Sequence, residues 1–516
     1  MLGIQVFNYP DKFVFFKDEC VEFNYRWLTE ELEIESDQIT FVEDVWAGGG
    51  NLGPSIEYFV DGLELGNMVF MQYKTFHDGS REELPIKIID VGIGLERVSW
   101  LINGSETSYL ETFKNALKFL SEKLEISTDS DIWKKFGPYS SKLDVDEAES
   151  IDETWKLIAK EIGEDENKIK NEIAPIRDMY IILDHSRTIF MIIYDGSLPS
   201  NVGGGSNVRN ILRRIFAILK RNNWLDKLKI EGLVDLMLEH IKDMEGIMGK
   251  FTVTTNFKEI IQLEYEKWTA TDDQQKDQLS KLLKKKKGVL TIDDWILAMQ
   301  SWGLPADSIS DITKLPIPGN LYYEISQKLE RTAKAQEQVL YDTTHLKETE
   351  NIFYSVQNQT KFEANILEIL ENKTDKNFKG KKNIVILDRS CFYPTSGGQQ
   401  HDTGFLIFNQ EKYEVLNVEK VGKCSLHILD REITGDVSRF VGMKVEGEID
   451  LEKRYQLMCH HTGTHVVFAA CRKVLGKHIW QNGAKKTIDQ AHLDITHYRA
   501  LTEDEKVKKF YFIILI

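Results

Sequence analysis

The sequence predicts an α/β protein of several domains, and three changes of pattern along the chain support this. Up to about residue 108, short apolar runs alternate with glycine-rich turns, as in a sheet. From about 111 to 337, apolar residues recur with helical periodicity and strand signals are nearly absent. From about 351, short alternating strands separated by turns return. A chain of 516 residues is long enough for roughly three or four domains.

The composition is that of a soluble globular protein, with 42% hydrophobic and 28% charged residues. No apolar run reaches the roughly 20 residues that span a bilayer, so no membrane partner is predicted. The five cysteines are few and lack a metal-binding or disulfide spacing, which favours a reduced, cytoplasmic setting. A net charge of −17 argues against a general nucleic-acid coat but is compatible with a local basic groove.

Three apolar runs in the first segment are predicted strands: Phe13–Phe16, Asn67–Tyr73 and Ile86–Ile89. The second of these is almost continuously apolar, so it is expected to be buried on both faces. Trp46–Pro54 contains four glycines and a proline. Because such residues hold neither a helix nor a central strand, a loop is predicted there.

Ile89–Trp100 is the most informative stretch of this segment. Gly92 and Gly94 alternate on a predicted strand, so one face lacks side chains and a flat ligand can lie against the backbone. Arg97, at the start of the following helix, is placed to bind a phosphate with its forked guanidinium. From the residues alone, a bulged strand that enters a helix explains this pattern as well.

The helical segment contains a glycine-rich turn that leads into a basic helix. Glu111–Leu120 is a predicted amphipathic helix. Asp195–Arg209 combines glycines with a helix N-terminus, which is a ready anion site. Arg209 and Arg213 lie four residues apart on one helical face, a spacing suited to a sugar-phosphate backbone. Arginines that simply face solvent are the alternative, and Lys284–Lys287 is expected to be a solvated helix end or loop.

The last segment is predicted to form a small β-barrel followed by a helix. Short alternating runs are separated by glycine turns such as Lys379–Lys381 and Thr434–Asp436. The predicted strands are Asn383–Leu387, Gly404–Phe408 and Lys444–Asp450. The helix is predicted because the apolar positions after His461 have helical spacing.

His461 and His465 lie four residues apart, so on a helix their imidazoles share one face and can bind one metal ion. Zinc takes about three or four protein ligands, so this pair is half a site. The zinc-protease pattern does not apply, because Thr462 stands where that pattern has its glutamate. On their own, two surface or core histidines explain the spacing equally well.

Taken together, several stretches resemble the archaeal branch of the alanyl-tRNA synthetases, which belong to class II. Ile89–Trp100 resembles their motif 3, and Trp46–Pro54 resembles a loop of the archaeal branch. Asp195–Arg214 is similar to their tRNA-binding helical domain, as is Asp184–Thr188 before it. Phe392–Gly404, with the two histidines, resembles their editing domain, which hydrolyses mischarged tRNA.

This resemblance implies four domains in order along the chain. Residues 1–110 would be the C-terminal part of the class II catalytic domain with its antiparallel sheet, and residues 111–345 an all-helical tRNA-recognition domain. Residues 346–450 would form the β-barrel of the editing region, and residues 451–516 the start of an α+β editing domain. The implied activity is that of an alanine–tRNA ligase, which uses ATP and Mg²⁺ to make alanyl-adenylate and then charges tRNA(Ala).

The resemblance also implies roles for residues of the first segment. As catalytic residues, Arg97 would hold the phosphates of ATP and Asp90 would pair with the ammonium of alanine. A buried carboxylate suits a cationic substrate group, because each reduces the desolvation cost of the other. The implied binding residues for alanine and ATP are Trp46, Asn67, Val69, Gly92 and Gly94.

Further roles are implied for the helical segment. The implied tRNA-binding residues are Asn201, Arg209, Arg213, Arg214 and Gln300. Gln300 stands where the family usually has an aspartate that, together with an asparagine matching Asn201, reads a G·U pair in the acceptor stem. A glutamine donates and accepts hydrogen bonds in a minor groove, but it is neutral.

In the editing region, the resemblance places Thr395 and Gln399 at the pocket and makes His461 and His465 two ligands of Zn²⁺. The family's other Cys and His ligands are expected beyond residue 516, and its motif 1 and motif 2 arginine before residue 1. We therefore expect a truncated chain, or one that works with a separately encoded complementing fragment. Lys508–Ile516 departs from the polar helix that the family has at this place.

Three functions follow as alternatives. The first is an alanine–tRNA ligase that is complete only with its flanking parts. The second is a tRNA-binding hydrolase that edits mischarged seryl- or glycyl-tRNA. The third is a tRNA-binding fragment without catalytic activity.

Overall fold

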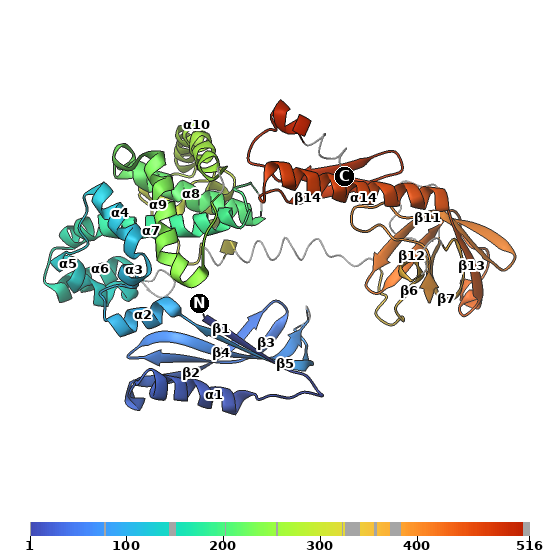
Figure 1. The fold of residues 1–516 in the computed structure, drawn as a ribbon, viewed down its shortest axis with the longest axis horizontal. Coiled ribbons are helices and arrows are strands. Elements are labelled where there is room, and N and C mark those ends of the chain that lie inside the picture. Colours follow the sequence, from blue (N-terminus) through green and yellow to red (C-terminus); the bar gives the residue numbers. More distant parts are fainter. Residues whose placement is uncertain are drawn as a thin grey trace. The chain divides into compact units, whose positions relative to one another are not determined.

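The computed structural model describes residues 2–508 apart from 77–78, 144–150, 202, 254–255, 322–323, 326–340, 356–358 and 372–382. Contacts divide the chain into two compact units. The first unit is residues 1–188 with 214–253, and the second unit is residues 189–213 with 254–516. The predicted turn at 379–381 and the predicted departure at 509–516 lie outside the described residues. Figure 1 colours the chain from blue at the N-terminus to red at the C-terminus.

Within the described part of the first unit, five strands form one antiparallel sheet in the order β1-β5-β4-β3-β2 (Figure 1). The strands are β1 (Leu2–Asn8), β2 (Ile39–Gly48), β3 (Asn51–Val60), β4 (Leu63–Thr75) and β5 (Arg81–Ile93). The predicted strands 67–73 and 86–89 lie inside β4 and β5 and are confirmed. Met68, Phe70 and Ile89 are buried in a core with Leu28, which follows helix α1 (Lys17–Arg26). Figure 1 shows α1 along one face of the sheet.

Two predictions for this region are wrong. Phe13–Phe16 is not a strand, because the side chain of Asn8 bonds its backbone in place of a neighbouring strand. Asn8 donates from Nδ2 to the Phe15 carbonyl and accepts at Oδ1 from the Val14 amide, both at 2.8 Å. Trp46–Pro54 is not a loop but the meeting of β2 and β3. Only Gly49 and Gly50 form the turn, with φ of 58° and 79°, which suits a two-residue hairpin that needs positive φ twice.

Helices make up most of the chain from residue 95 to residue 313. They are α2 (Leu95–Asn103), α3 (Ser108–Thr112), α4 (Lys114–Leu124), α5 (Asp131–Phe136), α6 (Ile151–Ile162), α7 (Glu166–Tyr194), α8 (Gly203–Arg221), α9 (Leu225–Met248), α10 (Asn256–Lys285), α11 (Ile292–Gln300) and α12 (Ala306–Thr313). The predicted single helix 111–120 is two helices, because Phe113 has non-helical backbone angles of −124° and 36°. Among the described residues, no helix combines the length and the apolar character needed to cross a membrane.

In the described part of the second unit, six strands close into a barrel in the order β10-β11-β12-β8-β7-β13. They are β7 (Lys361–Glu371), β8 (Asn383–Leu387), β10 (Gly404–Phe408), β11 (Glu411–Val421), β12 (Cys424–Leu429) and β13 (Lys444–Ile449). The three predicted strands and the predicted barrel are therefore confirmed. Val385, Leu406 and Phe392 are among its buried core residues. Two short strands, β6 (Glu350–Asn351) and β9 (Arg389–Ser390), pair in parallel beside it.

The predicted helix with the two histidines is also confirmed. It is α14 (Leu451–Leu475), and it begins where the side chain of Asp450 accepts a hydrogen bond from the amide of Lys453. A two-stranded sheet of β14 (Gln481–Lys486) and β15 (Ala491–Ile495) follows. The loop before β10 is joined to β14, because the amide of Gln400 donates to the carbonyl of Lys486 at 3.0 Å. This connection places the loop 395–400 beside the histidine helix.

Candidate functional site

One face of the sheet in the first unit brings together the residues predicted to bind alanine and ATP. Residues directly opposite each other on antiparallel strands have their side chains on the same side of the sheet. One row across the five strands consists of Gln5, Asp90, Val69, Ser55 and Asp44. The neighbouring row consists of Gly3, Gly92, Asn67, Glu57 and Val42. We call these two rows, with Trp46 beside them on β2, the polar sheet face.

The register thus places Asp90, Asn67, Val69 and Gly92 next to one another, although the sequence separates them by up to 25 positions. Val69 is buried, whereas Asn67 and Asp90 are half-buried. The carboxylate of Asp90 accepts a hydrogen bond from Nε2 of Gln5 at 3.4 Å. Among the described residues, no cationic side chain forms an ion pair with Asp90. Its negative charge is therefore available to a cationic group of a ligand.

Arg97 lies in the first turn of α2, next to the polar sheet face. Its Nη1 donates to Oε2 of Glu64 at 2.7 Å, and each side chain is about one-third exposed, at 36% and 31%. Gly94 lets the guanidinium of Arg97 approach the backbone closely, because a β-carbon at this position would push that side chain aside. The sequence predicted Arg97 and Gly94 but not Glu64, which lies 33 residues away on β4.

The polar sheet face suits a magnesium nucleotide in its donor chemistry. It carries three carboxylates, those of Asp44, Glu57 and Asp90. Magnesium takes oxygen ligands, commonly one or two carboxylates together with phosphate oxygens. A guanidinium beside these carboxylates adds a donor fork that matches phosphate. The described residues therefore have the types of side chain that bind Mg²⁺ and the phosphates of ATP.

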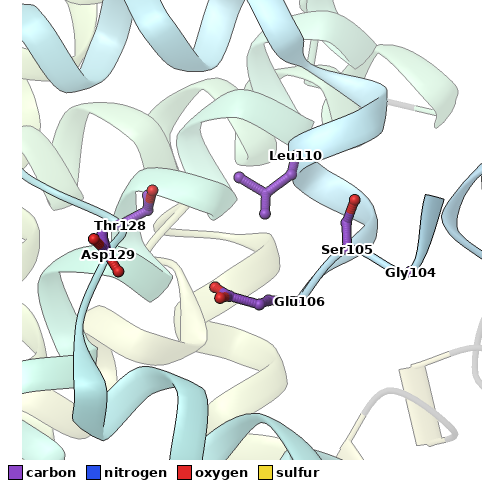
Figure 2. A pocket seen from close by; sticks show the side chains of 6 residues that line it. All are labelled: Gly104, Ser105, Glu106, Leu110, Thr128 and Asp129. Carbon is purple, nitrogen blue, oxygen red and sulfur yellow. The ribbon is translucent and has the colours of Figure 1, made fainter.

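A cavity of about 370 Å³ in the first unit contains none of the predicted site residues (Figure 2). It is lined by Gly104, Ser105, Glu106, Leu110, Thr128 and Asp129. Lys134 forms ion pairs with Glu106 at 3.6 Å and with Asp129 at 2.6 Å. Because the two carboxylates share this cation, the cavity is not an isolated acidic site.

Arg209 on α8 does not have the solvent-facing position that its spacing indicated. Its Nε and Nη2 donate to the two carboxylate oxygens of Glu264 at 2.8 and 2.9 Å, and both side chains are largely buried. Its Nη1 donates to Oδ1 of Asn201. Burial would raise the pKa of Glu264, but hydrogen bonds from Arg209 and Lys267 hold it below its usual value. The guanidinium of Arg209 is thus directed at protein groups.

Arg213 lies one turn further along α8, beside the turn that follows Gln300. Gly303 has a φ of 66°, which favours glycine, and it lies against the guanidinium of Arg213, which a β-carbon would push aside. Burial, followed by the charge of Arg209, lowers the pKa of Arg213. Gln300 is exposed at the last position of α11. The fold therefore brings two of the predicted tRNA-binding residues to one region.

Arg214 belongs to the first unit and lies near the Asp184–Thr188 stretch. Its Nη1 is 3.2 Å from Nε2 of His185, and Nδ1 of the same imidazole is 3.1 Å from a carboxylate oxygen of Asp184. The hydrogen bond with His185 lowers the pKa of Asp184. The two stretches that carried the resemblance in this region are therefore in contact.

In the second unit, His461 and His465 lie on one face of α14, as predicted. Their rings are nearly parallel, with centroids 5.2 Å apart and planes at 12°. Nδ1 of His461 is 2.8 Å from Oε1 of the buried Gln399. Because that oxygen accepts, Nδ1 carries the proton and Nε2 keeps its lone pair. Burial, then the nearby charges of Lys486 and His465, lowers the pKa of His461.

The other residues predicted for the editing pocket belong to the same loop. The hydroxyl of Thr395 is 3.0 Å from Nδ1 of His401. Lys486, only 1% exposed, donates from Nζ to the carbonyl of Gly397 at 2.8 Å, and burial lowers its pKa. The loop 395–400 thus presents Thr395 and Gln399 on a support that reaches β14 and α14.

A buried ion pair fastens this loop to the start of α14. Nε of Arg454 lies 2.9 Å from each carboxylate oxygen of Asp402, and its Nη2 donates to the carbonyl of Cys391 at 2.6 Å. The Asp402 carboxylate also accepts from the amide of Tyr393 at 2.8 Å. We call Thr395, Gln399, His461, His465 and Lys486 the histidine-helix site.

The described residues supply only part of a zinc site. His461 and His465 offer two imidazoles on one helical face, and Gln399 leaves Nε2 of His461 with its lone pair. Among the described residues, no group of three or more His, Cys, Asp or Glu side chains is placed to hold one ion. Since zinc takes about three or four protein ligands, these residues do not complete a site by themselves.

Three residues that contact these sites were not among the predicted site residues: Glu64, Glu264 and Lys486. Each meets its partner only through the fold, at separations of 33, 55 and 89 residues. A single acidic or basic residue at such a distance has no spacing that identifies its partner. The buried position of Glu264 within the largely polar α10 becomes visible only in the structure.

Comparison with known proteins places these features in one family. A family model described as tRNA synthetases class II (A) matches residues 1–453. The matched range includes the polar sheet face, all of α8 and the barrel, and it ends in the first turn of α14.

Curated relatives extend the likeness over nearly the whole chain. An alanine–tRNA ligase of Methanocella arvoryzae is 37% identical over 505 residues, which is 97% of this chain and 54% of that protein. Those of Metallosphaera sedula and Nitrosopumilus maritimus are each 35% identical, over 98% and 97% of this chain and 55% and 53% of their own lengths. The chain therefore spans about half the length of the curated relatives it matches.

Proposed function

We propose that the chain, which belongs to the class II tRNA synthetases, acts in attaching alanine to tRNA(Ala) through an alanyl-adenylate. The observation that carries this proposal is the polar sheet face. Its register gathers Asp90, Asn67 and Gly92, and Arg97 stands beside them on α2. Alanine, ATP and tRNA(Ala) would be the substrates, and the cytoplasm the place of action.

In this function, Asp90 accepts hydrogen bonds from the ammonium of alanine and orients its carboxylate toward ATP. Asn67 and Val69 lie opposite Gly92 and Asp90 on the neighbouring strand, where they would contact the methyl side chain of alanine. Arg97 donates to phosphate oxygens, where negative charge develops as the carboxylate attacks the α-phosphate. Preorganised donors of this kind account for most of the catalysis of phosphoryl chemistry. Mg²⁺ bound with ATP would neutralise further phosphate charge.

The roles of the chain's parts follow the order expected from the resemblance. Residues 1–110 would bind ATP and alanine, and residues 111–345 would bind tRNA. Residues 346–450 and 451–516 would belong to an editing region.

The test is binding of a non-hydrolysable alanyl-adenylate analogue, measured by calorimetry. Asp90→Asn and Arg97→Ala should each weaken binding about 10²-fold or more, as expected for loss of a preorganised charged contact. Glu106→Gln, in the cavity of Figure 2, is a matched control that should bind normally. If all three variants bind like the unaltered chain, the polar sheet face is not the adenylate site.

A second function, hydrolysis of mischarged seryl- or glycyl-tRNA, is favoured by the histidine-helix site. Gln399 fixes the tautomer of His461, and Thr395 lies on the same loop with its hydroxyl toward His401. Of the two substrates, these polar groups suit the seryl ester, whose side chain carries a hydroxyl. Release of serine from Ser-tRNA should fall with Gln399→Ala and with Thr395→Val, and stay unchanged with Arg431→Gln on the barrel surface. Metal content measured on the same samples would show whether Zn²⁺ accompanies the activity.

A further inference from the structure

Arg209 uses most of its hydrogen-bonding capacity inside the second unit. Two of its nitrogens make a bidentate ion pair with Glu264, at 2.8 and 2.9 Å. Its Nη1 donates to Oδ1 of Asn201, and Nη2 also lies 3.4 Å from the carbonyl of Pro199. The side chains of Arg209 and Glu264 are 14% and 5% exposed. Arg209 therefore connects α10 to the loop before α8.

This geometry leaves little of Arg209 for a phosphate. A phosphate could form a bidentate contact with the Nε and Nη2 edge of the guanidinium only by displacing Glu264. The carboxylate would then keep Lys267, 2.8 Å away, but lose both hydrogen bonds from Arg209 in a buried position. Breaking a buried charge pair in this way is strongly unfavourable, because a buried charge loses its compensation. The alternative that the arginines of α8 simply face solvent does not hold for Arg209, which is largely buried.

The contact with Asn201 also fixes which end of its amide faces outward. Arginine only donates hydrogen bonds, so the amide oxygen of Asn201 must be the end that faces Arg209. The amide NH₂ then faces away, and Asn201 is exposed. Asn201 thus presents donors, in a fixed direction, to whatever binds beside α8.

We propose that Arg209 and Glu264 form a positioning pair, which holds the loop Pro199–Asn201 and directs the amide of Asn201 toward bound tRNA without itself contacting phosphate. This rests on the proposed tRNA-binding function. Arg209 and Glu264 then contribute to tRNA affinity through Asn201. Their contribution should not depend on salt in the way that a phosphate contact does.

The experiment measures the dissociation constant of the full chain for a tRNA(Ala) transcript over a range of salt concentrations. The variants are Asn201→Ala, Arg209→Lys, Arg209→Gln, Glu264→Gln and the double variant Asn201→Ala with Arg209→Lys. Lys220→Gln removes one positive charge from α8 three turns away and serves as a charge control. Circular dichroism and thermal unfolding confirm that each variant is folded.

The positioning pair predicts that Arg209→Lys and Glu264→Gln each weaken binding about tenfold, the usual effect of losing one polar contact. The slope of log Kd against log salt should stay unchanged for both. Arg209→Lys should not preserve the affinity of the unaltered chain for tRNA, because lysine keeps the positive charge but lacks the planar fork of donors that arginine has. The double variant should bind no more weakly than Asn201→Ala alone, because residues that act through one contact are not additive.

The opposite results overturn the inference. If Arg209 contacts phosphate, Arg209→Lys binds almost normally, Arg209→Gln lowers the salt slope by about one unit, and Glu264→Gln has no effect. Additive losses in the double variant would also contradict a shared contact. If the unaltered chain binds no tRNA at any salt concentration, the proposed tRNA-binding function itself fails. That outcome is distinct from a failure of the positioning pair alone.

Discussion

The polar sheet face and the histidine-helix site hold their side chains in different ways. On the sheet, backbone register places Asp90, Asn67 and Gly92 together, and the hydrogen bond found at Asp90 is a long one to Gln5. At the histidine-helix site, hydrogen bonds of buried side chains hold the residues in place, from Arg454 to Asp402 and from Lys486 to Gly397. The first site should therefore be sensitive to backbone changes and the second to loss of charged partners.

This difference follows from the elements that carry the residues. Antiparallel strands fix the neighbours of every residue through their own hydrogen bonds, so a site on a sheet needs few extra supports. A loop that meets a helix has no such ladder, and each contact has to come from a side chain.

Arg454→Met should destabilise the second unit more than any other single change considered. It leaves the fully buried carboxylate of Asp402 without its cation, and breaking a buried pair typically costs about 3–5 kcal/mol. Hydrogen exchange should show faster opening of α14 and of the loop 395–400. Arg431→Met, whose partners lie on the exposed barrel surface, is the matched control and should cost less than about 1 kcal/mol. Equal losses in the two variants would mean that the buried pair does not hold the loop.

The barrel beneath the histidine-helix site should lose stability in acid because of His427. Complete burial lowers the pKa of His427 from 6.5 to about 4, while the imidazole bonds to Ser390 and to the carbonyl of Val385. Between pH 6.5 and about pH 4, His427 therefore binds a proton in the unfolded chain but stays neutral in the folded chain. Stability is therefore full above pH 6.5 and falls as the pH drops toward 4, by roughly 3 kcal/mol in total.

Urea unfolding between pH 4 and pH 8 measures this loss. His427→Gln should flatten the acid side of the profile, since glutamine keeps a polar group but does not titrate. His240 of the first unit, whose pKa burial lowers to about 3, gives a background that the variant does not change. An unchanged pH profile in His427→Gln would assign the acid sensitivity to other groups.

The polar sheet face should be disturbed most by Gly53→Ala. Gly53 lies opposite Trp46, and a β-carbon there would overlap the carbonyl oxygen of Phe70 on β4. The strands must shift, at about 1–3 kcal/mol for an overpacked position. Gly246→Ala on α9 of the same unit is the matched control, because its β-carbon would meet no atom within 4 Å. Thermal unfolding should separate the two, and only Gly53→Ala should weaken adenylate-analogue binding.

Sequence patterns predicted the elements that local physics determines. Apolar runs identified β4, β5 and the barrel strands, and helical spacing identified α8 and α14. The Trp46–Pro54 loop was predicted because glycines usually interrupt strands, yet only Gly49 and Gly50 turn the chain. The apolar run Phe13–Phe16 has no strand partner, since the side chain of Asn8 takes its backbone groups.

The candidate sites show the same limit of local patterns. The spacing of Arg209 predicted a phosphate contact, but its guanidinium pairs with Glu264, 55 residues later on another helix. In the same way, His461 was predicted from HxxxH spacing, whereas Gln399, which fixes its tautomer, was predicted only by resemblance. Long-range pairs of this kind have no signal in a single sequence.

The smallest effect on stability, with a clear effect on binding, is expected at Arg97 and Glu64. Their ion pair is about one-third exposed on each side, and pairs of that kind contribute about 0–1 kcal/mol. Arg97→Lys and Glu64→Gln should therefore leave the thermal midpoint nearly unchanged. Arg97→Lys changes the shape of the donor group: lysine keeps the positive charge but has no planar pair of donors like that of the guanidinium.

Binding of ATP in the presence of Mg²⁺ then separates the two roles of this pair. Arg97→Lys should weaken ATP binding about tenfold or more, because a bidentate phosphate contact becomes a single one. Glu64→Gln should weaken it less, since Arg97 keeps its fork over Gly94 and loses only its anchor. If Glu64→Gln instead strengthens ATP binding, then Glu64 competes with phosphate for the guanidinium, and the pair is a resting state. A large drop in thermal midpoint for either variant would show that the polar sheet face depends on side-chain pairs after all, as the histidine-helix site does.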